Sequence, residues 1–242
     1  MRINGVDVAY RRTGSGPPIV FVHGAAEDSR TWTPQFEALH DDFTVVAWDE
    51  PGGGHSGELP AEGFELGDYA ACLAGVIDSV RLGPAHVVGL SWGSTITLEL
   101  FHRHPEAVAT LILTGAYAGW KGSLPADEVA ARRAGVERML DAPPEHFDPT
   151  FPGLFAGEPP APFVPLLHTM AAEVRRHSMR TALSIMAGTD LNFVLPTISV
   201  PTLLVWGELD ARSPLRIAHE FERTIPNATL VVIPECGHVT NL

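Results

Sequence analysis

Residues 86–95 of the chain read HVVGLSWGST, in which two glycines bracket a serine directly after a short apolar run. The run predicts a buried strand, and residues 95–103 carry a helical pattern. Gly89 and Gly93 flank Ser91 as G-x-S-x-G. A sharp strand-to-helix turn needs small neighbours and holds its central residue in a strained backbone conformation. The pattern therefore predicts that Ser91 is a nucleophile exposed above the carboxyl end of a strand.

Similar apolar runs recur on both sides of this segment. They cover residues 19–22, 44–48, 110–113, 201–206 and 229–233. Runs that are apolar on both faces are typical of central parallel strands covered by helices. Helical patterns lie between several of them, including one from Tyr69 to Val80, and Ser213-Pro214 predicts the N-cap and first residue of a helix through Thr224. The alternation predicts an α/β fold with a mostly parallel central sheet flanked by helices.

One connection is too long for a plain crossover. Residues 115–200 separate two predicted strands, where a helix and short loops would suffice. The composition predicts helices over Leu124–Leu140 and Phe163–Ile185, and prolines from Pro143 to Pro165 predict an extended, stiff connector between them. We expect an inserted helical cap of residues 118–197 on a core formed by residues 1–117 and 198–242.

Downstream segments supply a base and an acid for Ser91. A serine hydroxyl is a weak nucleophile and needs a base, which in turn needs an orienting acid. Asp210 follows one predicted strand and His238 follows the next, so both should lie at the carboxyl edge of the sheet with Ser91. Glu208 is the alternative acid.

Two further motifs complete a family pattern. Residues 23–26 read HGAA and residues 49–56 read DEPGGGHS, each directly after a predicted strand. With Ser91, Asp210 and His238, these motifs resemble the α/β-hydrolase superfamily over nearly the whole chain outside the cap. The resemblance implies an α/β-hydrolase fold and a Ser-His-Asp triad that works through an acyl-enzyme. It also implies an oxyanion hole made by the amides of Ala25 and Trp92.

The predicted substrate is a small, largely apolar carboxylic ester or lactone. His23, Gly24 and Trp120 are candidate pocket residues. The cap is rich in apolar side chains that could line the pocket or simply fill the cap: Trp120, Phe147, Phe151, Phe155, Phe163, Met170, Met179 and Met186.

Three other functions stay open. The same triad serves hydrolases that cleave a carbon-carbon bond in vinylogous diketones. The elbow is also similar to that of prolyl aminopeptidases, in which case Glu173 or Asp127 would pair with a substrate ammonium. The third alternative is a ligand-binding member that keeps the triad without turnover.

The composition restricts the classes of molecule that the protein is expected to bind. The formal net charge is −13 and basic residues occur at most in pairs, which disfavours nucleic acid and anionic membranes as partners. No spacing of His, Cys or acidic residues indicates a metal, and we expect no cofactor. Two cysteines are too few for a disulfide framework, and we expect a cytoplasmic protein with a small-molecule substrate. The oligomeric state is open, with a dimer as one option.

Four residues follow His238, whereas members of the resembled family continue into a helix that covers one face of the sheet. We expect a chain extended by such a helix to melt at a higher temperature.

Overall fold

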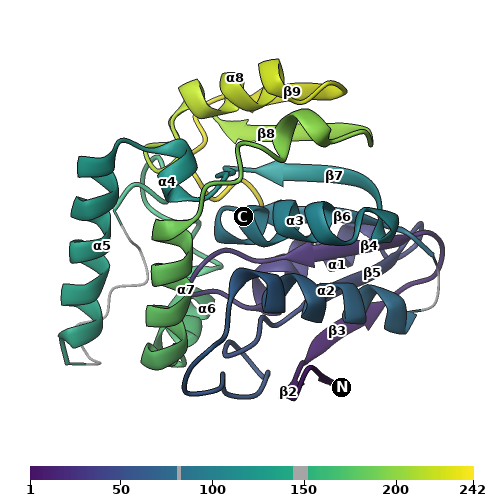
Figure 1. The fold of residues 1–242 in the computed structure, drawn as a ribbon, viewed down its shortest axis with the longest axis horizontal. Coiled ribbons are helices and arrows are strands. Elements are labelled where there is room, and N and C mark those ends of the chain that lie inside the picture. Colours follow the sequence, from purple (N-terminus) through teal and green to yellow (C-terminus); the bar gives the residue numbers. More distant parts are fainter. Residues whose placement is uncertain (81–82, 144–151) are drawn as a thin grey trace.

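The computed structural model describes residues 1–80, 83–143 and 152–242, and within them the sheet has seven strands in the order β3-β5-β4-β6-β7-β8-β9 (Figure 1). The strands are β3 (Tyr10–Thr13), β4 (Pro18–Val22), β5 (Thr44–Trp48), β6 (Ala85–Leu90), β7 (Val108–Thr114), β8 (Thr202–Gly207) and β9 (Ala228–Ile233). Strand β3 pairs antiparallel with β5, and the other pairs are parallel. A separate hairpin joins β1 (Arg2–Ile3) to β2 (Val6–Asp7). The predicted mostly parallel sheet is confirmed.

Helices cover both faces of this sheet. One face packs against α2 (Leu66–Val80), α3 (Trp92–Arg103) and α8 (Leu215–Thr224), and the other against α1 (Thr33–Leu39). Alternate residues of a strand serve the two cores: Val20 belongs to the larger cluster and Phe21 to the smaller one. The structure also contains short 3-10 helices, which are η1 (Ser29–Trp32), η2 (Pro105–Ala107) and η4 (Leu195–Thr197).

The strand order reverses beside β4, and this reversal places the site. The chain runs from β4 to β5 on one side and then crosses back to β6 on the other side. The loops that leave the carboxyl ends of β4 and β6 therefore turn in opposite directions and leave a crevice between them. Open α/β sheets bind ligands at such a switch point.

Within the described residues, four α-helices lie between β7 and β8 along the chain, and Figure 1 shows them gathered at one end of the molecule. They are α4 (Trp120–Ser123), α5 (Ala126–Asp141), α6 (Val164–Ala172) and α7 (Arg176–Gly188). The helix expected over Leu124–Leu140 corresponds to α5. The domain boundaries predicted at residues 118 and 197 stay a prediction.

The helical stretch expected over Phe163–Ile185 forms two short helices, α6 and α7, with a break between them. Arg175 is extended there, with φ −83° and ψ 109°. Its guanidinium donates to the carbonyl oxygens of Ser56 (2.7 Å) and Gly54 (2.9 Å) in the core. This tertiary anchor replaces a helical turn that the composition favours.

The proline-rich connector is only partly described, because residues 144–151 lie outside the described residues. Beyond them the chain makes turns, and Pro165 lies in the first turn of α6, where a missing amide hydrogen costs nothing. The expected N-cap at Ser213 was wrong. Its amide donates to Asp210 Oδ1 (2.7 Å) and its hydroxyl to the Ala116 carbonyl (2.9 Å), so α8 begins at Leu215.

Strand β9 differs from the buried central strand that its composition predicts. It forms an edge of the sheet, and its side chains Val231 and Val232 are 46% and 37% exposed. Position in the sheet, which composition does not encode, decides this exposure. Across the part of the chain with described structure, no helix is long and apolar enough to cross a membrane.

Candidate active site

The predicted turn at Ser91 forms between β6 and α3. Ser91 has φ +53° and ψ −114°, a conformation that L-residues adopt only under constraint. A Cβ at Gly93 would lie 2.3 Å from the Val22 carbonyl oxygen, and one at Gly89 would lie 2.7 Å from Thr97 Oγ1. Both glycines are therefore required for the close approach of the turn to β4 and α3.

Asp210 and His238 meet although 28 positions separate them in the chain. His238 Nδ1 lies 2.8 Å from Asp210 Oδ2, and both side chains are buried. The other carboxylate oxygen of Asp210 accepts the amides of Arg212 (2.8 Å) and Ser213 (2.7 Å). These contacts hold the carboxylate in place and aim the second ring nitrogen of His238 away from it. Glu208, the alternative acid, instead accepts the Glu235 amide (3.0 Å).

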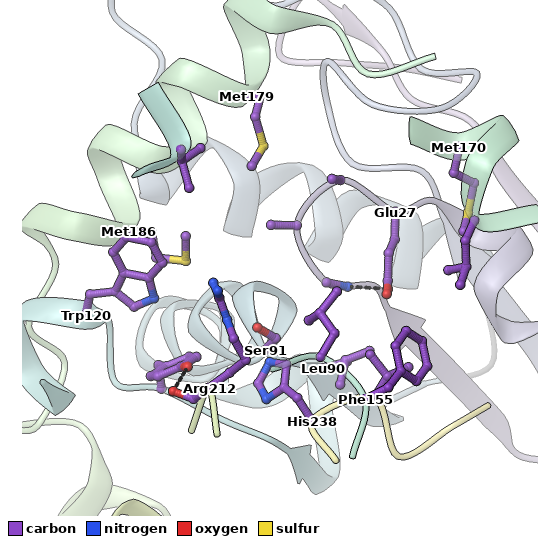
Figure 2. Close-up of a pocket in the computed structure, with 18 residues that line it drawn as sticks. Glu27, Leu90, Ser91, Trp120, Phe155, Met170, Met179, Met186, Arg212 and His238 are labelled. Atoms are coloured by element: carbon purple, nitrogen blue, oxygen red, sulfur yellow. Dashed lines mark hydrogen bonds between the residues drawn. The ribbon is translucent and has the colours of Figure 1, made fainter. Parts of the chain in front are cut away.

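Ser91 and His238 line the same cavity, and Figure 2 shows the Ser91 hydroxyl beside the His238 ring. Among the described residues, no hydrogen bond yet joins Ser91 Oγ to the ring. In ligand-free hydrolases this contact is often long and tightens only when substrate binds. The three side chains predicted to act together are thus brought to one place.

The amides of Ala25 and Trp92 are the predicted oxyanion donors. Ala25 follows β4 and lines the cavity, and Trp92 is the first residue of α3. Within the described residues neither amide has a hydrogen-bond acceptor. The first amides of a helix have no intrahelical partner and favour an anion. The Trp92 side chain is buried separately, with Nε1 donating to Glu50 Oε2 (2.6 Å).

The cavity lies between the sheet edge and the cap. Its empty volume is about 790 Å³, including space open to solvent. Its apolar wall comes from the cap, through side chains that include Trp120 of α4, Met170 of α6 and Met186 of α7 (Figure 2). Gly24 forms part of the opposite wall.

His23, a candidate pocket residue, does not line the cavity, and its ring contacts backbone groups instead. The side chain is 1% exposed and lies behind the cavity. Its Nε2 accepts the Glu50 amide (3.1 Å), so the proton is on Nδ1, which donates to the Gly24 carbonyl (2.8 Å). With both nitrogens bound to backbone, the ring fixes the loop after β4.

Only some of the other apolar residues that were candidates for the pocket wall line the cavity. Phe155 and Met179 line the cavity, Phe163 lies outside it, and Phe147 and Phe151 are outside the described residues. The carboxylates considered for an ammonium are also elsewhere: Asp127 is exposed on α5, and Glu173 pairs with Arg30. Neither of the two carboxylates that the peptidase alternative needs therefore lines the cavity.

Sequence reasoning missed several residues of the site, and three of them matter for the chemistry. Glu27 and Arg212 line the cavity, and Gly115 lies against the His238 ring: a Cβ at Gly115 would lie 2.8 Å from His238 Nδ1. Glu27 and Arg212 stand next to recognised motifs, which is the only signal that could have indicated them. For Gly115 the signal is a glycine directly after a predicted strand.

Glu27 is a titratable group in the cavity wall. Its Oε2 accepts the Gly24 amide (3.1 Å). Burial raises the pKa of the Glu27 carboxyl to about 7, against the opposing effects of His23 and the Gly24 amide, and Asp28 adds to the rise. The carboxyl can therefore change charge near neutral pH.

The fold and this arrangement of serine, histidine and aspartate define a class of hydrolases. The family model described as alpha/beta hydrolase fold matches residues 17–184, more than half of the chain, and the chain therefore belongs to the α/β-hydrolase family. The predicted family and fold are confirmed, and the chain is an α/β hydrolase.

Three relatives illustrate the range of this family. The chain is 29% identical to a 2-hydroxy-6-oxononadienedioate/2-hydroxy-6-oxononatrienedioate hydrolase of Burkholderia vietnamiensis, over 96% of the chain and 84% of that enzyme. It is 26% identical to an (E)-2-((N-methylformamido)methylene)succinate hydrolase of Acinetobacter baylyi, over 96% and 88%. An esterase from Exiguobacterium antarcticum superposes with a TM-score of 0.88 at 27% identity, over 97% of this chain and 90% of the esterase.

Proposed function

We propose that the protein is a serine hydrolase that cleaves a carboxylic ester or lactone of a small molecule through Ser91, His238 and Asp210. One observation carries the proposal: the buried His238–Asp210 hydrogen bond of 2.8 Å lies beside a serine held at φ +53° on the floor of a cavity. Similarity to a solved esterase supports it. The cytoplasmic location expected from the sequence stays a prediction.

In the first half of the mechanism, Ser91 Oγ attacks the carbonyl carbon while His238 Nε2 takes the hydroxyl proton. The carbonyl electron pair moves onto its oxygen, which the Ala25 and Trp92 amides stabilise. Asp210 holds the imidazole tautomer and stabilises the imidazolium. When the electron pair returns, the bond to the leaving oxygen breaks, and that oxygen takes the proton from His238.

In the second half, water attacks the acyl-enzyme while His238 removes one of its protons. The tetrahedral intermediate collapses, the carboxylic acid leaves, and Ser91 recovers its proton from His238. Each amide of an oxyanion hole typically lowers the activation free energy by about 3 kcal/mol. Backbone donors supply this because the loop and helix that carry them are already in place.

A carbon-carbon hydrolase is the second candidate, because the dienedioate hydrolase relative is named for such a substrate class. The same serine, histidine and oxyanion donors serve that reaction. Activity on p-nitrophenyl acetate without activity on a vinylogous 1,5-diketone favours the ester or lactone, and the opposite result favours carbon-carbon cleavage.

We expect Ser91→Ala to lower kcat on p-nitrophenyl acetate by about 10⁴-fold or more, because the triad acts as a unit. The measurement is the initial rate of p-nitrophenolate release, with labelling by a fluorophosphonate probe as a second readout. Ser79→Ala, on the distant helix α2, is the matched control and should retain both. Hydrolysis that persists in Ser91→Ala contradicts the proposal. Labelling without turnover on any ester or diketone indicates the ligand-binding alternative.

A further inference from the structure

The guanidinium of Arg212 is an unused cation in the cavity. Arg212 lies two residues beyond Asp210, lines the cavity with Ser91 and Trp120, and is half-buried. Figure 2 shows its side chain rising from the loop after β8 toward the centre of the cavity. Burial lowers the pKa of this guanidinium, and the neighbouring Arg132 adds to the effect, against the opposing effects of Tyr117, Asp210 and Glu128.

The other half-buried arginines of the described residues have hydrogen-bond acceptors for their guanidinium groups. Each of the following half-buried arginines donates a side-chain hydrogen bond to the protein: Arg11, Arg30, Arg132, Arg175, Arg176 and Arg180. Within the described residues, Arg212 is the half-buried arginine whose guanidinium has no such acceptor. Buried or partly buried charges are costly when unpaired, so the free donors in a ligand cavity indicate that the ligand supplies the acceptor.

The backbone of Arg212 is fixed from both sides. Its amide donates to Asp210 Oδ1 (2.8 Å), and its carbonyl oxygen accepts from Tyr117 Oη and from Arg132 Nη2 (2.7 Å). Arg132 is itself paired with Glu128. The side chain therefore starts from a rigid position beside the triad, and rigid placement lowers the entropic cost of binding.

Resting on the serine-hydrolase function above, we propose that Arg212 binds a carboxylate of the substrate, so that the natural substrate is an ester or lactone bearing a free carboxylate near the scissile carbonyl. A guanidinium presents parallel N–H donors that match a carboxylate. The cap supplies the apolar contacts for the rest of the molecule. The substrate class is therefore anionic, which amends the largely apolar substrate expected from the sequence.

Matched ester pairs test this assignment. One pair is 3-acetoxybenzoate and 3-acetoxybenzamide, with the carboxylate in the leaving group, and the other is monomethyl adipate and methyl adipamate, with the carboxylate in the acyl group. We expect wild type to favour the carboxylate member of at least one pair by about tenfold or more in kcat/KM. Arg212→Gln should reduce this ratio to about one, and Arg212→Lys should retain part of it.

The controls separate binding from an indirect role. Arg223→Gln removes an equal charge from an exposed part of α8 and should leave the ratio unchanged. If Arg212 acts only through Asp210, Arg212→Gln lowers kcat for both members of a pair equally, and the unchanged ratio overturns the proposal. A wild-type ratio near one in both pairs overturns it as well.

A titration without turnover keeps the two proposals apart. Calorimetry on Ser91→Ala should show 3-hydroxybenzoate or adipate binding more tightly than the matching amide by about tenfold, and Ser91→Ala/Arg212→Gln should lose this preference. If the carboxylate and its matching amide bind Ser91→Ala with equal affinity in both ligand pairs, the proposed role of Arg212 is overturned. Absence of Ser91-dependent hydrolysis instead counts against the serine-hydrolase function, and the titration then still decides on Arg212.

Discussion

Gly115 packs against His238, the base of the proposed triad. It has φ +49°, and a Cβ would lie 2.8 Å from His238 Nδ1 and 2.9 Å from Cε1. Since Nδ1 is the atom that faces Asp210, a methyl group here must displace the ring. We expect Gly115→Ala to lower kcat/KM by about 10²-fold, the effect of misplacing a catalytic group by about 1 Å. The measurement is steady-state kinetics on p-nitrophenyl acetate.

The matched control for Gly115 is Gly63. It also has positive φ, at +80°, but a Cβ there has no neighbour within 4 Å. Gly63→Ala should therefore lower stability through backbone strain while leaving kcat/KM near that of wild type. Equal losses of activity in the two variants would mean that contact with His238 is unimportant.

Glu27 links stability to pH. Burial raises its pKa to about 7 in the folded state, whereas in the unfolded chain the group ionises near 4.5. Between these values the folded state binds more protons, so the Glu27 contribution to stability is complete at low pH and falls as pH rises toward 7. Glu27→Gln has no such loss, and its stability relative to wild type should increase by about 2 kcal/mol across this window.

Urea unfolding of wild type and Glu27→Gln at pH 4.5 and pH 7.5 measures how the difference between their free energies of unfolding changes with pH. The residues that face Glu27 are His23, Asp28 and the Gly24 amide, and the side-chain oxygen of the glutamine in the variant can still accept that amide. Exposed Glu106, with 75% of its side chain accessible, is the control, and Glu106→Gln should show little dependence on pH. A Glu27→Gln difference that is the same at both values refutes the raised pKa.

At the scale of elements, Arg175 attaches the cap helix α7 to the core. Its two hydrogen bonds reach the carbonyl oxygens of Gly54 and Ser56, and its Nε lies 3.0 Å from Glu58 Oε1. We expect Arg175→Met to raise KM by about three- to tenfold with a smaller change in kcat, because the cap wall of the cavity loosens while the triad stays in place. The hydrogen bonds from a charged donor are worth about 1.5 to 3 kcal/mol each.

Arg180→Met is the comparison for this variant. Arg180 lies within α7, whereas Arg175 directly precedes that helix, and Arg180 pairs with Glu137 and Asp141 of α5, so it joins parts of the cap to each other. Hydrogen exchange over residues 52–58 should accelerate in Arg175→Met and stay slow in Arg180→Met. Identical exchange in the two variants would show that Arg175 does not anchor the cap.

For the whole molecule, the distance of a strand from the sheet edge governs what a substitution costs. Val46 on β5 is fully buried, whereas Val231 on the edge strand β9 is 46% exposed. We expect Val46→Ala to lower the free energy of unfolding by about 2 to 3 kcal/mol through lost burial and a cavity. Val231→Ala should cost less than about 1 kcal/mol. Chemical denaturation checks both, and equal costs would contradict the gradient.

The parallel strands β4 to β9 and the proposed triad could be predicted from the sequence because their signals are local, whereas the short antiparallel strand β3 has no apolar run and was not predicted. An apolar run next to a glycine, serine, aspartate or histidine shows both the strand and the edge of the sheet at which the side chain emerges. Parallel strands end at one edge, so Ser91, Asp210 and His238 could be placed together without knowing any contact between them. The signal for β9 was incomplete, since an apolar run does not reveal whether a further strand lies beside it.

Tertiary structure alone decided what surrounds that triad. Gly115 against His238, Arg175 on the Gly54 carbonyl and Arg212 in the cavity are contacts or placements between segments far apart in the chain. Their physical basis is close packing and the satisfaction of buried polar groups, which depend on the neighbours that folding brings in. His23 shows the same dependence, because its ring faces backbone groups and lies behind the cavity that its motif suggested.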